Sequence, residues 1–242
     1  MNAPPNIPAL SKTHDWRPLS QVYARFGRIH IPAVLTPESA ARVHRCLTAE
    51  TPYSLVVNNG SQYFDIPAQD QAKMSPEQRK ALADSAVAGA QRGFQLFYEN
   101  HRLTEQGEPY PDPNHYLAAV VAFLNSPEFL FFIRAVTGEP KIAFADAQAT
   151  RYGPGHFLTT HDDGIAGKNR VAGYILNMTP QWLADWGGNL LFLNKQGHIT
   201  EGYVPAFNAL NLLRVPQPHC VSHVAPFAGA YRYSITGWFR TR

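Results

Sequence analysis

The sequence predicts an α+β fold in which a helix-rich N-terminal half packs on a C-terminal antiparallel β-barrel. Two observations support this prediction. Before Pro140, helix-start signals precede segments with apolar residues every three or four positions. After Pro140, short β-rich segments alternate with glycine, proline and asparagine, which is typical of a sandwich or barrel. We therefore expect an N-terminal arm over residues 1–20 and one domain over 21–242, with its barrel core at about 140–242.

The first elements follow from local signals. Residues 27–35 (GRIHIPAVL) are typical of a strand, and Thr36-Pro37 supplies an N-cap and a first-turn proline for a helix through about Glu50. Residues 53–66 predict a hairpin, because Asn59-Gly60 separates two β-rich segments.

Three further helices are predicted before the barrel. Residues 75–78 (SPEQ) form a capping box that opens a long helix, which we expect to carry Leu82, Val87, Phe94, Leu96 and Phe97. Asn114 and Ser126-Pro127 are typical caps of two apolar helices, the second ending at Gly138. Eight strand-like segments then follow: KIAFADAQATRY, HFLTTHDD, RVAGYILNM, GNLLFLN, ITEGYV, ALNLLRV, CVSHVAPF and YRYSITGWF.

Composition disfavours several classes of protein. The formal net charge is only +3, with acids and bases mixed along the chain, so we expect no nucleic-acid partner. Two cysteines without a CxxC motif favour a reducing compartment. The start of the chain has no signal-peptide pattern, and no apolar run approaches the roughly 20 residues of a membrane helix. These features predict a cytoplasmic protein without a membrane partner.

Common catalytic motifs are missing, and one short cluster remains. The chain has no phosphate-binding GxxxxGK loop, no GxGxxG, no GxSxG and no HExxH. It does contain His161-Asp162-Asp163. Positions i and i+2 of a strand point to the same face, so His161 and Asp163 can converge while Asp162 points away. Such a pair arises easily by chance and needs a further ligand.

A later segment, VPQPHCVSHVAPF, offers that ligand as His219 or His223. Two histidines and one carboxylate on one face of a metal leave positions open for a bidentate ligand and O₂, as in non-haem Fe(II) oxygenases. An oxygenase that uses 2-oxoglutarate also needs a cation for the far carboxylate of this cosubstrate. Arg232 follows the histidines, with Ser234 on the same strand face, and the planar guanidinium suits a carboxylate.

The ordered segments RYGPGHFLTTHDD, GYILNM, GGNLLFL, PAFNALNLL, PHCVSHV and RYSITGWF resemble the prolyl-4-hydroxylase-like branch of the Fe(II)/2-oxoglutarate dioxygenases. The resemblance is greatest to the cytoplasmic group that includes the ribosomal-protein prolyl hydroxylases, and it covers roughly residues 140–242. It implies a double-stranded β-helix (jelly-roll) core, with the metal at its open end and the N-terminal helices as a buttress.

The resemblance also implies roles for individual residues. His161, Asp163 and His219 match the iron ligands; His219 is preferred to His223 because HCVSHV fits the pattern H-x-V-x-x-V. Arg232 matches the anchor of 2-oxoglutarate, and Tyr152 matches the tyrosine that bonds the same carboxylate. Further candidates for that pocket are Tyr174 and Ser234. Candidates for the substrate are Arg170, alternatively a solvent-facing arginine, and Trp238, alternatively a core residue.

The implied activity is hydroxylation of a substrate C–H by Fe(II), 2-oxoglutarate and O₂, with release of succinate and CO₂ and with ascorbate as an activator. The foremost substrate is a prolyl residue of a protein or peptide. One alternative keeps these cofactors and acts on free proline or another small amino acid or metabolite. Another is a jelly-roll binding protein without turnover.

Overall fold

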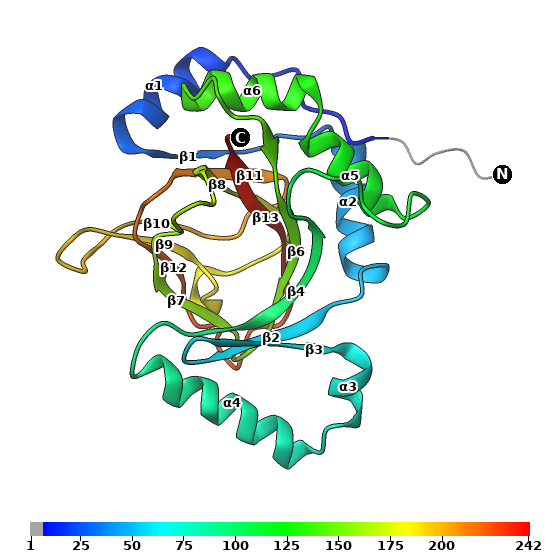
Figure 1. Cartoon of the computed structure of the whole chain (residues 1–242), viewed down its shortest axis with the longest axis vertical. Helices are drawn as coiled ribbons and strands as arrows, with labels where there is room; N and C mark the ends of the chain where they lie inside the picture. The colour runs from blue at the N-terminus through cyan, green and yellow to red at the C-terminus, as the bar shows by residue number, and fades with distance from the viewer. Residues whose placement is uncertain (1–6) are drawn as a thin grey trace.

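The computed structural model describes residues 7–242 and arranges them around a thirteen-stranded sheet that curls into a nearly closed barrel (Figure 1). The predicted α+β fold with a jelly-roll-type core is therefore confirmed. Residues 1–6 of the predicted arm lie outside the described residues.

The helices are α1 (Trp16–Phe26), α2 (Pro37–Ala49), α3 (Ala68–Lys73), α4 (Pro76–Ala90), α5 (Tyr116–Leu124), α6 (Pro127–Thr137) and the 3-10 helix η1 (Ala184–Trp186). The strands from the N-terminal half are β1 (Arg28–Ile31), β2 (Ser54–Asn59), β3 (Gln62–Pro67) and β4 (Leu96–Thr104). The remaining strands are β5 (Phe144–Ala145), β6 (Ala147–Tyr152), β7 (Phe157–His161), β8 (Arg170–Asn177), β9 (Leu190–Leu193), β10 (Ile199–Tyr203), β11 (Ala209–Arg214), β12 (His219–Val221) and β13 (Arg232–Arg240).

The strand order shows that the barrel is larger than its predicted core of about 140–242. Neighbouring strands run in the order β1-β11-β8-β13-β6-β4-β7-β12-β9-β10, and β2 extends the sheet from β4 while β3 pairs with β2. All of these pairs are antiparallel. Seven of the eight predicted β segments contain a strand of their own, whereas CVSHVAPF is extended only at Cys220–Val221, the end of β12. Strands β1 and β4 are also integral, because β4 links β6 to β7.

The predicted long helix ends earlier than expected. The capping box at Ser75 is present and opens α4, but α4 stops at Ala90. Leu96 and Phe97, expected on this helix, lie on β4, and Phe94 lies just before it. Pairing with β2 and β6 outweighs the local helical pattern.

The other helix predictions are largely correct. Thr36 caps α2 and Ser126 caps α6, which ends at Gly138 in the left-handed conformation. The cap of α5 is His115 rather than Asn114. Helix α1 begins at Trp16, inside the predicted arm, so the segment just before the predicted domain is helical too.

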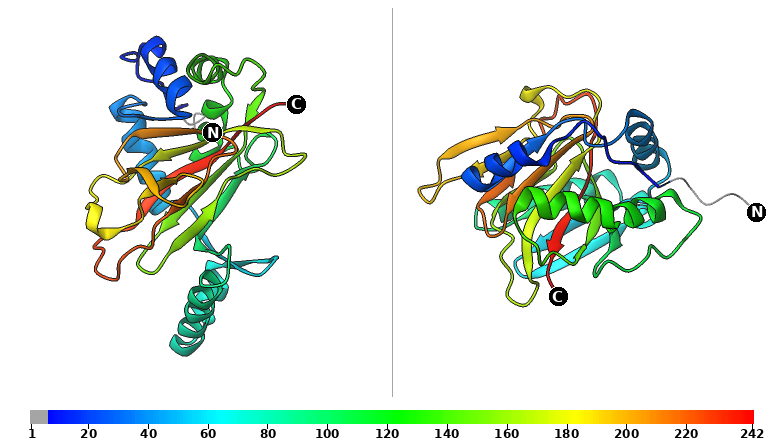
Figure 2. Two further views of the ribbon diagram at one scale, coloured as in Figure 1. Left: turned by 90° about the vertical axis from the view of Figure 1, so that its left-hand side faces the viewer. Right: turned by 90° about the horizontal axis from the view of Figure 1, so that it is seen from above.

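Helices cover the outer face of the barrel on one side. The main apolar core lies between α1, α2, α5 and α6 and the outward side chains of β8, β11 and β13. Helices α3 and α4 lie on the opposite side and project away from the barrel (Figure 2). Among residues 7–242 both cysteines are free, and no single helix is long and apolar enough to cross a membrane, although the bent pair α5–α6 passes by length and composition. The inside of the barrel is left for the site.

Candidate metal centre and its pocket

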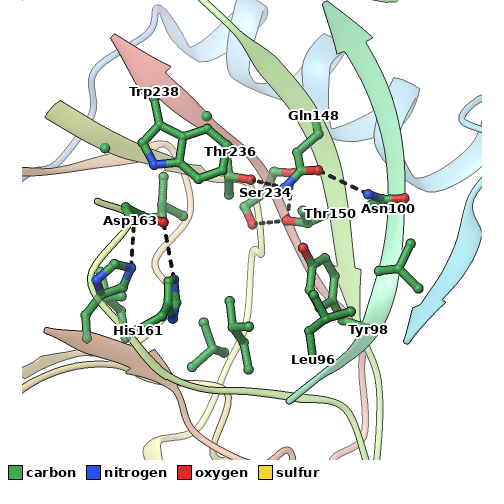
Figure 3. A pocket seen from close by; sticks show the side chains of 18 of the residues that line it. Leu96, Tyr98, Asn100, Gln148, Thr150, His161, Asp163, Ser234, Thr236 and Trp238 are labelled. Atoms are coloured by element: carbon green, nitrogen blue, oxygen red, sulfur yellow. Dashed lines mark hydrogen bonds and ion pairs between the residues drawn. The ribbon is translucent and has the colours of Figure 1, made fainter. Parts of the chain in front are cut away.

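Three side chains with metal-binding donor atoms meet inside the barrel. His161 ends β7, His219 begins β12, and these two residues face each other across the β7–β12 pair. The carboxylate of Asp163 faces both imidazoles, with Oδ1 3.4 Å from Nε2 of His161 (Figure 3). Its Oδ2 lies 3.5 Å from Nε2 of His219. The three donor atoms lie within 4.8 Å of one another. The structure thus brings together the three residues that the sequence analysis selected.

Backbone hydrogen bonds fix which nitrogen each imidazole presents. Nδ1–H of His161 donates to the carbonyl oxygen of Thr159 at 2.9 Å, and Nδ1–H of His219 donates to that of Gln217 at 2.8 Å. In the neutral form of each ring, Nε2 is therefore the nitrogen with the lone pair, and both Nε2 atoms face Asp163. A second hydrogen bond of this kind is how metal-bound histidines are normally held.

Charge in this cluster is divided unevenly. Burial alone would raise the pKa of Asp163, but the hydrogen bond from His161 and the nearby His219 lower it below its usual value. Burial opposes charge on both imidazoles. The hydrogen bond to Asp163 nevertheless raises the pKa of His161. Burial and the neighbouring His161 lower the pKa of His219. An ionised carboxylate beside imidazoles is a donor set suited to a divalent transition metal.

The route by which Asp163 reaches the cluster differs from the predicted one. Strand β7 ends at His161, so Asp163 lies in the following turn with a left-handed φ of 64° rather than two positions along a strand. Asp162 is exposed, and its Oδ1 accepts the N–H of Gly164, which holds it away from the cluster. The expectation that Asp162 points away is correct, but a turn achieves it.

The other histidines near this segment lie elsewhere. The ring of His223 packs on Phe157, with centroids 5.9 Å apart, and does not line the pocket of the metal cluster. His156 accepts the N–H of Gly153 and packs on Phe97 behind β4. Of the two alternatives for the third ligand, the structure places only His219 with His161 and Asp163.

A second group of potential ligands lies outside the barrel, where donor atoms of Cys46, Glu50 and His115 also fall within 4.8 Å of one another. The imidazole is already engaged, since Nδ1 accepts the N–H of Leu117 and Nε2–H donates to the carbonyl oxygen of Glu50. Arg42 binds both carboxylate oxygens of Glu50. These contacts leave this group without a free donor set.

Arg232 lies deep in the same pocket as the metal cluster. It is 2% exposed, and its Nε and Nη1 have no hydrogen-bond partner in the described part of the chain. Its guanidinium lies 5.1 Å from the ring centre of Tyr152, which stacks on Tyr98 at 4.7 Å. Burial lowers the pKa of Arg232. A buried cation with free donors is costly unless an anion joins it, so these atoms fit a carboxylate ligand.

Two further candidates for the cosubstrate pocket differ in their placement. Ser234 is fully buried beside Arg232, and its hydroxyl lies 2.8 Å from that of Thr150. Tyr174 does not present its hydroxyl to the pocket: it donates to the carbonyl oxygen of Asp146 and its ring packs on Phe239 in the core. Tyr174 contributes to the lining of the pocket, but its hydroxyl and ring face the core because neighbouring residues of β8 face opposite sides of the sheet.

The metal end of the pocket is bordered by Arg170 and Trp238. The guanidinium of Arg170 lies 3.4 Å from the ring centre of Trp238, and its Nη1 donates to the backbone oxygen of Asp163 at 3.2 Å. Burial lowers the pKa of Arg170. Both side chains line a pocket of about 840 Å³. Arg170 is therefore not a freely solvated arginine, and Trp238 is part of the pocket wall.

Several pocket residues were missed by the sequence analysis. Gln148 and Thr150 on β6 face inward with Tyr152, at alternate positions. This period of two could have identified them. Asn100 and Tyr98 come from β4, which local patterns had assigned to a helix, so the sequence carried no usable signal for them.

Comparisons with known proteins agree with this site. Residues 147–240 match the model of the 2OG-Fe(II) oxygenase superfamily. No curated protein matches the chain. Residues 147–240 also contain the histidine–aspartate cluster and Arg232.

Three solved structures share the fold over most of the chain. A prolyl-4-hydroxylase from Pseudomonas putida is 17% identical with a TM-score of 0.59, covering 94% of this chain and 100% of that one. A 2OG-Fe(II) oxygenase family oxidoreductase from Burkholderia pseudomallei is 13% identical with a TM-score of 0.65, covering 99% and 96%. A Trichoplax adhaerens prolyl hydroxylase, solved with a hypoxia inducible factor peptide fragment, is 16% identical with a TM-score of 0.60, covering 92% and 87%.

Over residues 147–240 the chain is thus similar to the 2-oxoglutarate- and Fe(II)-dependent oxygenases. Its fold is shared with prolyl-4-hydroxylases.

Proposed function

We propose that this protein hydroxylates a prolyl residue of a protein or peptide, with Fe(II), 2-oxoglutarate and O₂ as reactants and succinate and CO₂ as co-products. The observation that carries the proposal is the pairing, in one pocket, of the His161–Asp163–His219 cluster with a buried, unpaired Arg232. A binding module without turnover would have no need for both.

The residues present fit the proposed cofactors. His161, Asp163 and His219 would hold Fe(II) through two Nε2 atoms and one carboxylate. Arg232 would bind the far carboxylate of 2-oxoglutarate through its free N–H groups, with Tyr152 and Ser234 beside it. Bound iron with this cosubstrate and O₂ supplies the oxidising power for C–H hydroxylation.

The protein itself contributes position and exclusion of water. The Thr159 and Gln217 carbonyl oxygens keep both imidazoles oriented, and the stacked Tyr98–Tyr152 pair shields the guanidinium of Arg232. Trp238 and Arg170 border the metal cluster, where we propose that they contact the substrate.

The choice of a prolyl substrate rests on fold similarity to two prolyl hydroxylases, one of them solved with a peptide fragment. The pocket agrees with this choice in being wide, with aromatic and apolar side chains from β2, β4 and β12 on its walls. A cytoplasmic location and activation by ascorbate remain predictions.

The decisive experiment measures succinate released from 2-oxoglutarate with Fe(II) and ascorbate, together with a +16 Da product on prolyl peptides. We expect His161→Ala and Arg232→Ala to lose at least about a hundredfold in turnover, since each removes a ligand of a reactant. His198→Ala and Arg92→Ala, at exposed positions that do not line the pocket, are the matched controls and should keep wild-type turnover.

Two results would contradict the proposal. Absence of succinate from the iron-loaded wild type would exclude an oxygenase, and tight ligand binding without turnover would favour a binding protein. Hydroxylation of free amino acids but of no peptide would move the substrate to the alternative class.

A further inference from the structure

Three adjacent strands carry a regular ladder of side chains on the pocket wall. Strand pairing sets Arg232 opposite Tyr152, Ser234 opposite Thr150, and Thr236 opposite Gln148. On the other side of β6, Thr150 faces Asn100 and Gln148 faces Arg102. We name these levels the deep rung (Tyr98, Tyr152 and Arg232), the middle rung (Asn100, Thr150 and Ser234) and the upper rung (Arg102, Gln148 and Thr236).

The upper rung is beyond the reach of a cosubstrate anchored at Arg232. Two residues along a strand span about 6.7 Å, so Thr236 lies roughly 13 Å along β13 from Arg232. The terminal carbons of a five-carbon dicarboxylate are only about 5 Å apart at ordinary C–C bond lengths. Bound 2-oxoglutarate would thus pass the middle rung at most. The upper rung, next to Trp238 on β13, is left for the substrate.

Hydrogen bonds hold the amide of Gln148 across this wall. Its Oε1 accepts Nδ2–H of Asn100 at 3.1 Å, and its Nε2–H donates to Oγ1 of Thr236 at 3.4 Å (Figure 3). An amide has two N–H donors and an oxygen with two lone pairs. The second N–H lies beside the hydroxyl of Tyr98, whereas the second lone pair of Oε1 has no partner among residues 7–242.

The free lone pair of Gln148 Oε1 matches one kind of partner. A peptide group carries an N–H that an amide oxygen can accept. A free amino acid would present charged groups, for which a neutral amide is a poorer partner than a guanidinium. The nearest guanidinium on this rung, Arg102, is exposed and already paired with Glu105 at 2.6 Å. Arg170, the other guanidinium of this pocket, is stacked on Trp238 and donates to the backbone oxygen of Asp163. At Gln148 the wall therefore offers a neutral partner that suits a peptide group.

We propose that Gln148 is a specificity-determining residue that hydrogen-bonds a backbone peptide group of the substrate next to the hydroxylated residue. This inference rests on the proposed function and deepens it, since it selects polypeptide over free amino acid. Asn100 and Thr236 act through Gln148 as positioning residues.

The test replaces Gln148 by methionine, which has nearly the same length but no amide. The probes are a panel of prolyl tripeptides with acetylated N-termini and amidated C-termini, and free proline. We expect Gln148→Met to lower kcat/KM for tripeptide hydroxylation about tenfold, as for a lost hydrogen bond with an unpaired partner. KM for 2-oxoglutarate and peptide-independent succinate release should stay within about twofold, which a general structural defect would not allow.

Controls separate this inference from the proposed function. Gln196→Met, on an exposed turn, is the matched substitution and should match the wild type. Gln148→Asn keeps an amide but moves it away from the substrate, because its side chain is one CH₂ group shorter. It should lower tripeptide hydroxylation as Gln148→Met does, and it tests the inference on its own should Gln148→Met fold poorly. Unchanged tripeptide hydroxylation in both Gln148 variants, or wild-type action on free proline alone, overturns the inference. Succinate release with no hydroxylated tripeptide also overturns it, whereas a wild type that releases no succinate defeats the proposed function itself.

Discussion

At the scale of single residues, Asp146 links the pocket wall to the outer core. It is 7% exposed; its Oδ1 accepts the N–H of Trp238 at 2.7 Å, and Nη1 of Arg240 lies 3.4 Å from its Oδ2. Burial raises the pKa of Asp146 to about 6, although the Trp238 N–H and the nearby Arg170 and Arg240 lower it. The ionised form is thus disfavoured in the very residue that supports the backbone of Trp238.

This raised pKa predicts a pH-dependent stability. The folded state binds the proton of Asp146 more tightly than the unfolded chain, whose carboxyl has the ordinary value of 3.8. Its stabilising contribution is therefore complete below about pH 4 and is lost as the pH rises through about 6. Asp146→Asn keeps an oxygen for the Trp238 N–H but cannot ionise.

We expect the free energy of unfolding of Asp146→Asn to gain about 2 kcal/mol relative to the wild type between pH 4.5 and pH 7.5. Urea denaturation of both proteins at the two pH values measures this difference, and other carboxyl groups cancel because both proteins share them. Parallel pH profiles would show that Asp146 ionises normally.

The identity of the candidate ligands could be predicted, because they lie close together in the sequence or follow one another in a characteristic order. The orientation of each side chain could not be predicted. His161 and Asp163 are two residues apart, and either a strand or a turn can bring them together. The hydroxyl of Tyr174 points to the core, because a shift of one residue along β8 exchanges the pocket face of the sheet for its core face. Gln148 was not predicted as a site residue, because its side chain is held by hydrogen bonds to Asn100 and Thr236, which lie on two other strands.

At the scale of elements, β13 carries most of the pocket wall. Its alternate residues Arg232, Ser234, Thr236 and Trp238 all line the pocket, while the strand pairs with β5, β6 and β8. Gly237 faces the other way, where an added Cβ would lie 2.1 Å from the backbone oxygen of Asp146. Backbone on the facing strand segment leaves no room for a side chain there.

Gly237→Ala should therefore shift β13 and damage both stability and the pocket. We expect a loss of at least about 2 kcal/mol in the free energy of unfolding, as for overpacking that neighbours cannot relieve, and a higher KM for 2-oxoglutarate. Gly93→Ala is the matched control, because an added Cβ there meets nothing within 4 Å. Equal denaturation midpoints for the two variants would contradict this account of β13.

Helices and hairpins that are marked by capping or turn residues could be predicted, and elements that depend on pairing with distant strands could not. Capping residues marked α2, α4 and α6, and Asn59-Gly60 marked the β2–β3 hairpin. The end of α4 was missed because apolar residues continue past Gly93 into β4 at a spacing that also fits a helix. Helix α1 was missed in a proline-rich context, although Asp15 and Gly27 cap it.

At the scale of the whole molecule, the barrel is completed by chain from both halves. Strand β1 pairs with β11, which lies more than a hundred residues further along the sequence, and β4 of the N-terminal half lies between β6 and β7. Periodicity within the C-terminal half predicts strands but not which N-terminal segment pairs with them. The helices α1, α2, α5 and α6 then cover the outer face behind the pocket wall (Figure 1).

The contact between α6 and β13 allows the packing of the helices on the barrel to be tested without changing a residue of the pocket. Phe129 on α6 is 2% exposed, and its ring centre lies 4.5 Å from that of Phe123 and 6.1 Å from that of Phe239 on β13. Phe129→Ala should cost about 3–5 kcal/mol in the free energy of unfolding, because the cavity forms in a packed core. Phe131→Ala, on the same helix at a position 61% exposed, should stay within about 0.5 kcal/mol of the wild type. At temperatures well below its reduced melting temperature, Phe129→Ala should keep KM for 2-oxoglutarate within about twofold of the wild type, because the helices support the barrel without contacting the pocket. Similar melting temperatures for Phe129→Ala and Phe131→Ala would show that α6 is not part of the folding core.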